Sequence, residues 1–247
     1  MSIESPEDLE ALREIGRLVG QTIQEVAARV RAGVSTAELD EVGAEFLARH
    51  GATPAPKAVY GFPGAIMISV NDEVVHSVPG ARRLAAGDLV KIDVTAERGG
   101  YYADAATTVA VPPVSPLNNN LIQAAQAAFR KAARVAWAGN RVSDIGRAVE
   151  SEVKRRGFTV LRDLCGHGVG RTIHEAPEVP NYFNPHNRAM LTAGLVLTIE
   201  PILSAGGPDV KLDADGWTYR TTDGSRAAHF EHTLVITRER PILLTQV

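Results

Sequence analysis

Residues 89–95 read Leu-Val-Lys-Ile-Asp-Val-Thr, and residues 101–109 read Tyr-Tyr-Ala-Asp-Ala-Ala-Thr-Thr-Val. Both runs are rich in β-branched and alternating apolar residues, which predicts two strands joined by a tight turn. A turn centred on Arg98-Gly99 places Asp93 opposite Asp104, with Cβ atoms roughly 5 Å apart. Two carboxylates at that spacing repel each other, and a cation between them removes the repulsion. Taken alone, the hairpin is equally compatible with two solvated aspartates on an exposed ribbon.

The segment around Asp93 has a counterpart in the second half of the chain. Residues 84–94 read Leu-Ala-Ala-Gly-Asp-Leu-Val-Lys-Ile-Asp-Val, and residues 191–201 read Leu-Thr-Ala-Gly-Leu-Val-Leu-Thr-Ile-Glu-Pro, so Asp93 falls on Glu200. Spaced glycines recur in the same order: Gly33 with Gly139, Gly51 with Gly157, and Gly87 with Gly194. This pattern indicates an internal duplication, in which each half has a pair of helices followed by strands that carry carboxylates.

Helical and strand patterns follow one another in both halves. Helical spacing of apolar residues and a Ser35/Glu38 capping box predict that helices precede strands in each half. This order predicts an α/β fold of the α+β type, with curved antiparallel sheets and helices packed outside. The predicted helices cover residues 7–31, 35–51, 118–138 and 142–156, and the predicted strands cover 65–70, 89–95, 102–111, a stretch near Ile173, 194–202 and 230–236.

Bulk properties limit the classes of protein. A chain of 247 residues with 45% hydrophobic content can form one domain, 1–247, with halves of about 7–113 and 117–245 on either side of the proline-rich joint 112–116. The net charge of −3 argues against nucleic acid as a partner. No apolar run approaches the roughly 20 residues that span a membrane, and no signal peptide pattern is present. With Cys165 as the single cysteine, we expect a cytoplasmic protein.

Five dispersed residues are candidate ligands of one paired-metal site: Asp93, Asp104, His167, Glu200 and Glu231. Apolar and polar residues alternate along the strands of Asp93 and Glu200, so both carboxylates lie on the face opposite the buried apolar side chains. Four carboxylates and one imidazole suit two divalent ions of cobalt, manganese, iron or zinc. Two such ions roughly 3.5–4 Å apart would share carboxylates and a water whose pKa falls to about 7, which makes hydroxide available for hydrolysis.

The other histidines and the cysteine carry weaker signals. His167 has three glycines around it, which suggests a closely packed backbone but by itself is more typical of a loop. His76, read alone, is an ordinary loop residue, His174 lies in the same segment as His167, and His232 is only a neighbour of Glu231. His50, His186 and His229 have no supporting context, so we assign them to the surface or to loops. Cys165 is interpreted as a small packed thiol beside the site rather than as a nucleophile.

Together these residues resemble the type I methionine aminopeptidases over nearly the whole chain. The motifs that carry the resemblance are Asn71-Asp72-Glu73-Val74-Val75-His76, the Asp93/Asp104 hairpin, Cys165-Gly166-His167-Gly168-Val169-Gly170, Thr198-Ile199-Glu200-Pro201 and Glu231-His232-Thr233. The resemblance implies a pita-bread fold of two pseudo-symmetric halves. It also implies a monomeric hydrolase in protein maturation that removes the initiator methionine of nascent polypeptides, near the ribosome.

The resemblance also implies a role for each motif residue. Asp93 chelates one metal, Asp104 and Glu231 bridge both, and His167 with Glu200 completes the second. Glu200 further relays a proton from the metal-bridging water, which attacks the first peptide bond, to the leaving amine. His76 contacts the substrate near the scissile amide, and His174 steadies the oxyanion. The substrate's first side chain would lie against Phe62, Met67, Ile173 and Trp217.

Three positions depart from the family pattern. Met67 stands where cysteine is frequent, Ile173 where an aromatic residue is frequent, and Ser77 where glycine is usual, so the preference for the first residue is less firmly implied than the metal site. An Xaa-Pro aminopeptidase or prolidase-like enzyme is the first alternative, but such relatives carry Asp and Gly at the places of His232 and Ile202. A metal-free binding module on the same fold is the second, although all five ligand residues are present.

Overall fold

The computed structural model describes all residues from Met1 to Val247 and contains five helices. Two of them begin at serine capping boxes, in which the serine hydroxyl and a carboxylate three residues later each accept a backbone N–H. Ser5 and Asp8 form one box, and Ser35 and Glu38 form the other, which confirms the predicted start of the second helix. The helices are α1 (Pro6–Ala27), α2 (Thr36–Arg49), α3 (Ala55–Tyr60), α4 (Pro116–Ala133) and α5 (Val142–Arg155).

The strands form one large sheet and two small ones, and every pairing is antiparallel. The nine-stranded sheet has the order β1-β4-β5-β14-β9-β7-β8, with β2 also on β4 and β15 also on β14. The small sheets have the orders β13-β10-β6 and β11-β12-β3. The bounds are β1 (Thr53–Pro54), β2 (Met67–Val70), β3 (Glu73–Val75), β4 (Leu89–Arg98), β5 (Tyr101–Ala110), β6 (Thr159–Val160), β7 (Cys165–Gly168), β8 (Glu175–Pro180), β9 (Val196–Ile199), β10 (Ile202–Ser204), β11 (Val210–Leu212), β12 (Tyr219–Thr221), β13 (Ala227–His229), β14 (Glu231–Val235) and β15 (Ile242–Leu243).

The turn between β4 and β5 differs from the predicted one. Arg98 pairs with Tyr101, so the two turn residues are Gly99 and Gly100, with φ of 63° and 81°. Two successive residues with positive φ are what a type I′ turn requires, and the twist of that turn matches the twist of the strands. The glycine pair therefore decides the position of the turn, one residue later than a centre on Arg98-Gly99.

This position changes the register of the hairpin. Asp93 lies opposite Ala106, and Asp104 lies opposite Thr95, so the predicted direct pairing of the two aspartates is wrong. The shift amounts to two residues along one strand, and side chains alternate with a period of two. Asp93 and Asp104 therefore stay on the same face of the sheet, as diagonal neighbours.

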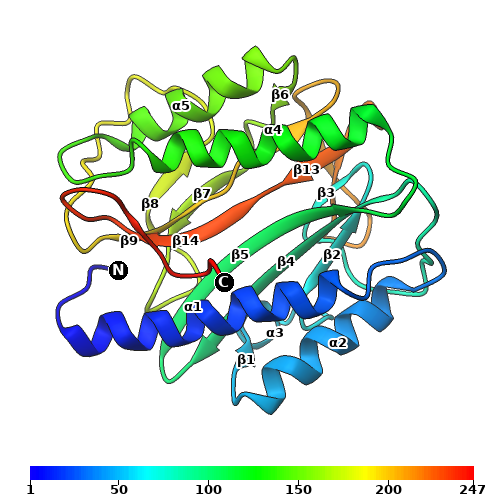
Figure 1. The fold of residues 1–247 in the computed structure, drawn as a ribbon, viewed down its shortest axis with the longest axis horizontal. Helices are drawn as coiled ribbons and strands as arrows, with labels where there is room; N and C mark the ends of the chain where they lie inside the picture. The colour runs from blue at the N-terminus through cyan, green and yellow to red at the C-terminus, as the bar shows by residue number, and fades with distance from the viewer.

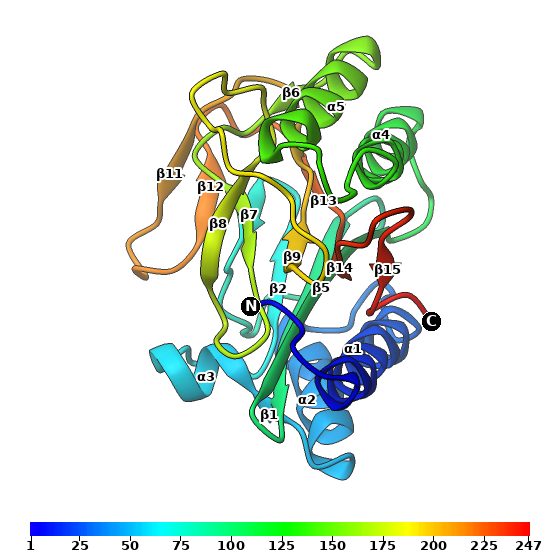
Figure 2. The same ribbon diagram turned by 90° about the vertical axis from the view of Figure 1, so that its left-hand side faces the viewer.

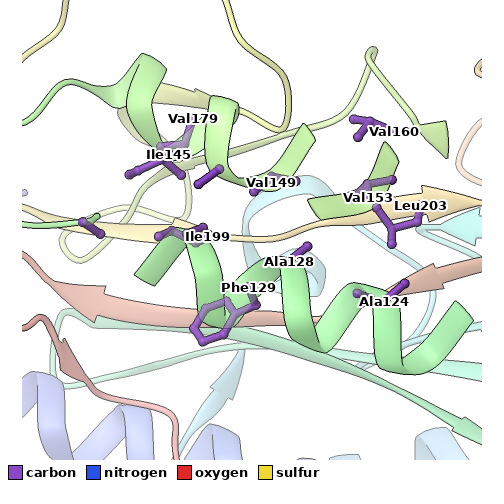
Figure 3. Packing of buried hydrophobic residues seen from close by; sticks show 14 of the residues in the cluster. Ala124, Ala128, Phe129, Ile145, Val149, Val153, Val160, Val179, Ile199 and Leu203 are labelled. Atoms are coloured by element: carbon purple, nitrogen blue, oxygen red, sulfur yellow. The ribbon is translucent and has the colours of Figure 1, made fainter. Parts of the chain in front are cut away.

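The helices form two pairs that pack against the large sheet in different places. Figure 1 shows α4 and α5 above the strands and α1 and α2 below them, and in the turned view of Figure 2 α1 and α4 lie to the right of the large sheet while β11 and β12 of a small sheet lie to its left. A cluster of 22 buried residues fills the space between the sheet and the pair α4 and α5, and one of 18 fills the space between the sheet and the pair α1 and α2. Figure 3 shows Phe129 of α4, Val149 of α5 and Ile199 of β9 in the larger cluster. Each helix pair thus has its own core on one common sheet, as the predicted α/β class requires.

The glycines that align between the halves share an unusual backbone conformation. Each of the three aligned pairs has positive φ in both copies, with 89° and 105° for Gly33 and Gly139 and 86° and 89° for Gly87 and Gly194. Such φ values are easy only for glycine, so the matches mark equivalent turns rather than chance identities. This agreement supports the duplication inferred from the sequence.

Some predicted elements have different bounds or are divided. The strand expected near Ile173 is β8, which begins at Glu175, while Ile173 itself lies in the bend between β7 and β8. The expected strand 194–202 is divided into β9 and β10 at Pro201, a residue that cannot donate to a ladder. No helix combines the length and the apolar content that a membrane crossing requires.

Candidate metal centre

The candidate ligands occupy two neighbouring rows across the large sheet. Ala106 of β5 pairs with Asp93 of β4 on one side and with Glu231 of β14 on the other, so these three residues form the first row. The second row runs from Asp104 of β5 through Thr233 of β14 to Thr198 of β9, whose hydroxyl accepts the backbone N–H of His167. Adjacent rows on one face bring together residues that are more than a hundred positions apart in the chain.

All five predicted ligand residues are buried in this place. Glu200 follows the last residue of β9, where Pro201 ends the strand, and lies beside the start of β14. Nε2 of His167 is 3.7 Å from Oδ2 of Asp104 and 3.8 Å from Oε1 of Glu200. Asp93, Asp104, His167, Glu200 and Glu231 are each at most 9% exposed. The structure thus assembles one cluster from the dispersed positions that the sequence singled out.

The ring of His167 is held in the tautomer that a metal ligand needs. Its Nδ1 lies 2.8 Å from the carbonyl oxygen of Gly168, so Nδ1 donates and Nε2 keeps its lone pair. Burial, with a smaller contribution from the charge of His174, lowers the pKa of His167 to about 4, so the imidazole is neutral at pH 7. Nε2 therefore points a lone pair toward Asp104 and Glu200.

The four carboxylates, Asp93, Asp104, Glu200 and Glu231, form what we name the acidic cluster, and their pKa values are all raised. Burial raises the pKa of Asp93 to about 8, and the neighbouring Asp104 adds to the shift. Burial and then the charge of Glu231 raise the pKa values of Asp104 and Glu200 well above the ordinary range, and burial with the charge of Asp93 does so for Glu231. Four buried carboxylates without a counter-charge are unfavourable, because each desolvated charge repels the others.

Several polar atoms of the cluster have no hydrogen-bond partner in the protein. Thr198 donates to Oε1 of Glu200 at 3.0 Å, yet Oδ1 of Asp104 and Oε1 of Glu231 are buried and unpaired. Buried acceptors are normally satisfied, so these oxygens call for a cation. A divalent metal fits, because carboxylate oxygens and one imidazole nitrogen are ordinary ligands for manganese, iron, cobalt and zinc.

One residue of the cluster was missed by sequence reasoning. His229, assigned above to the surface or a loop, is the last residue of β13 and is 1% exposed, so that assignment is wrong. Burial lowers its pKa to about 4. Its Nε2 lies 3.3 Å from Oε2 of Glu231. The available signal was its position two residues before Glu231, since alternate residues of an extended chain share a side.

The cluster lines a cavity of about 140 Å³. The lining residues include His76, His174, Met67, Ile173 and Trp217, together with Cys165 and all five predicted metal ligands. Met67 of β2 pairs directly with Asp93, which places it beside the acidic cluster. Phe62 is not in the lining. It is 1% exposed and packs edge-on against Trp217, with ring centroids 5.3 Å apart, so it supports the wall from behind.

The two histidines at the cavity differ in their surroundings. His76 follows β3 with a φ of 58°, a conformation that is uncommon outside glycine, and lies edge-on to the ring of Tyr219. His174 precedes β8, and its Nδ1 is 2.7 Å from the hydroxyl of Tyr60. Tyr60 thus orients the ring of His174, a contact that no feature of the sequence indicated.

Known proteins share both the sequence and this fold. The model of metallopeptidase family M24 matches residues 10–238. Methionine aminopeptidase 2 of Bacillus subtilis is 42% identical over the full length of both proteins, and methionine aminopeptidase of Clostridium perfringens is 40% identical over 99% of this chain and 98% of that protein. The crystal structure of methionine aminopeptidase from Thermotoga maritima matches with a TM-score of 0.97 and 36% identity, covering all of both chains.

A family match over most of the chain, with a buried cluster suited to divalent metal, defines the class: the chain belongs to metallopeptidase family M24. The full-length relatives named above are methionine aminopeptidases, which confirms the resemblance seen in the sequence motifs and the pita-bread fold that it implied.

Proposed function

We propose that this protein is a metal-dependent aminopeptidase that removes the N-terminal methionine from polypeptides. The observation that carries the proposal is the acidic cluster with His167 in the lining of a small cavity, in a chain that matches methionine aminopeptidases over its whole length. The finer expectations, which are action on nascent chains near the ribosome, a monomeric state and a cytoplasmic location, stay predictions.

We assign two divalent ions to the cluster. Asp93 would hold one ion, His167 and Glu200 would hold the other, and Asp104 and Glu231 would contribute ligand atoms to both. The unpaired oxygens of Asp104 and Glu231 support the bridging role, because a bridging carboxylate uses both of its oxygens. When bound, such ions polarise the substrate carbonyl and lower the pKa of water toward 7.

Protein groups at the cavity supply the proton transfers and the orientation. Glu200 can carry a proton to the leaving amine, because its carboxylate lines the cavity beside His167. His174, with Nδ1 held by Tyr60, keeps Nε2 for the substrate oxygen that becomes negative. His76 lines the same cavity, and we assign it to contact the scissile amide.

The apolar part of the lining is suited to one side chain. Met67, Ile173 and Trp217 border the cavity, and Met67 lies directly beside Asp93. Methionine at this wall is unbranched and adaptable, so it accommodates a flexible thioether. A single methylene in an apolar pocket changes selectivity by only about 1–3 kcal/mol, so discrimination between methionine and leucine should be modest.

The test is a kinetic comparison of Met-Ala-Ser with Xaa-Pro-Xaa peptides, each with added manganese, iron, cobalt or zinc. We expect cleavage of Met-Ala-Ser only in the presence of metal, with Xaa-Pro peptides left intact. Preference for Xaa-Pro peptides would favour the prolidase-like alternative, and purified protein that binds no metal would favour a binding module.

The two cavity histidines give a further prediction. His76→Ala and His174→Ala should lower kcat/KM for Met-Ala-Ser by about 10²–10⁴, the range expected for a lost proton-transfer or oxyanion contact. Both variants should keep the metal content of the unmodified protein, measured by elemental analysis. His186→Ala, in an exposed loop, is the matched control. Stoichiometric loss of metal in either variant would make that histidine a ligand instead.

A further inference from the structure

His229 is fixed so that its ring faces the acidic cluster. Its backbone N–H donates to Oγ1 of Thr108 at 2.9 Å, and that hydroxyl donates to the carbonyl of His229 at 2.8 Å. From this position Nε2 lies 3.3 Å from Oε2 of Glu231 and 3.6 Å from Oε2 of Glu200. The side chain is buried and lines the same cavity.

Neither ring nitrogen of His229 has a hydrogen-bond partner. Two other histidines packed inside the protein are different: Nδ1 of His167 pairs with the carbonyl of Gly168, and Nδ1 of His232 pairs with the hydroxyl of Thr245, each at 2.8 Å. A histidine that served only to fill the core would be expected to have such a partner, because an unpaired buried nitrogen is unfavourable. The ring of His229 is therefore prepared for a partner outside the protein chain.

The spacing of the surrounding atoms matches a metal shell. Ligand atoms at about 2.0–2.2 Å from an ion, at angles between a right angle and the tetrahedral angle, lie roughly 2.8–3.6 Å apart. The 3.3 Å between Nε2 of His229 and Oε2 of Glu231 falls within that range. Asp93, His229 and Glu231 can each offer one ligand atom with all three atoms within 4.8 Å of one another. A second such group consists of Asp104, His167 and Glu231.

We propose that His229 is a sixth protein ligand of the metal centre and binds, through Nε2, the ion held by Asp93 and Glu231. This inference rests on the two-ion centre proposed above and changes its composition. Each ion then has one imidazole, from His167 on one side and from His229 on the other. A nitrogen donor shifts the preference of the Asp93 site away from manganese and toward zinc or cobalt, since imidazole suits the later metals.

The experiment compares metal-loaded unmodified protein with His229→Gln, His229→Ala and the control His186→Gln, whose site lies in an exposed loop. X-ray absorption of the zinc-loaded or cobalt-loaded proteins counts imidazoles per ion, and calorimetric titration of the apoprotein gives the two binding constants. We expect an average of one imidazole per ion in the unmodified protein and in His186→Gln. In the His229 variants we expect half that number, and one of the two binding constants should weaken by at least about 10–100-fold.

Three outcomes would overturn the proposal. The first is an average of half an imidazole per ion in the unmodified protein, and the second is unchanged binding constants in both His229 variants. The third is weakened binding with an unchanged imidazole count, which would make His229 a hydrogen-bond donor to the ligands. The number of imidazoles per ion in the unmodified protein tests whether His229 is a ligand even if a His229 variant does not fold. Failure of the proposed function would look different, because the unmodified protein would then bind no metal or leave Met-Ala-Ser uncleaved.

Discussion

Glu231→Gln should reduce kcat/KM for Met-Ala-Ser by more than about 10³, a loss greater than that from removing one oxyanion-stabilising donor. The amide has nearly the same shape as the carboxylate, so the packing around β14 is preserved. It has only one oxygen to offer and no charge, so it cannot bridge two cations. We therefore expect at most one tightly bound ion per chain in this variant.

Elemental analysis and kinetics on the same preparation provide the check, with Glu239→Gln in an exposed loop as the matched control. The control should retain two ions and full activity. Two ions and near-normal rates in Glu231→Gln would remove Glu231 from the bridging position. Loss of the fold, visible as a lost thermal transition, is not expected, because the substitution removes one of four mutually repelling buried charges.

Removal of metal should lower the melting temperature more strongly at pH 8 than at pH 6.5. Without metal, burial and Asp104 raise the pKa of Asp93 to about 8 from an ordinary value near 3.8. The stabilisation that comes from holding this proton is complete below about pH 4 and is lost as the pH rises through 8. Asp104, Glu200 and Glu231 act in the same direction. The apoprotein therefore weakens over a range in which bound metal, by neutralising the carboxylates, keeps the holoprotein stable.

The quantity to measure is the difference between the melting temperatures of metal-loaded and chelator-treated protein at the two pH values. At a free metal concentration about 1,000 times Kd, binding adds about 4 kcal/mol, which corresponds to roughly 8–16 °C in a protein of this size. Burial also lowers the pKa of Lys91 to about 7, but Lys91 affects both forms alike and cancels in the difference. If this difference in melting temperature stays constant or shrinks toward pH 8, then the buried carboxylates of the acidic cluster do not carry the unfavourable charge that we assign to them.

The sequence was sufficient for the ligand positions that belong to a local pattern. Asp93 and Asp104 were placed on one face from the expected hairpin, although the register was wrong because two glycines, rather than Arg98-Gly99, form the turn. The error does not change the face on which the two side chains lie, because side chains alternate between the faces of a sheet and a shift of two residues restores the same face. The helix starts at Ser5 and Ser35 follow from local hydrogen bonds, and the second of them was predicted for that reason.

Other parts of the site depend on contacts between distant segments. No local pattern brings β14 between β5 and β9, so the meeting of Glu231 with Asp93 and Glu200 was inferred from family resemblance. His229 was assigned to the surface or a loop because its neighbours in the sequence gave it no supporting context, whereas its position depends on hydrogen bonds with the distant Thr108. The contact of Tyr60 with His174 joins a short helix to a bend, and neither element has a periodic sequence pattern.

The candidate ligands are divided between early and late parts of the chain. Asp93 and Asp104 are synthesised first, while Glu231 lies in β14, sixteen positions before the last residue, Val247, and β14 joins β5 to β9 in the middle of the sheet. A growing chain that has emerged only as far as α4 holds two of the four carboxylates and lacks the strand that completes the row. Metal uptake is then a late step in the biosynthesis of this protein. A metal-loaded centre requires that β14, near the end of the chain, has paired with β5 from the first half.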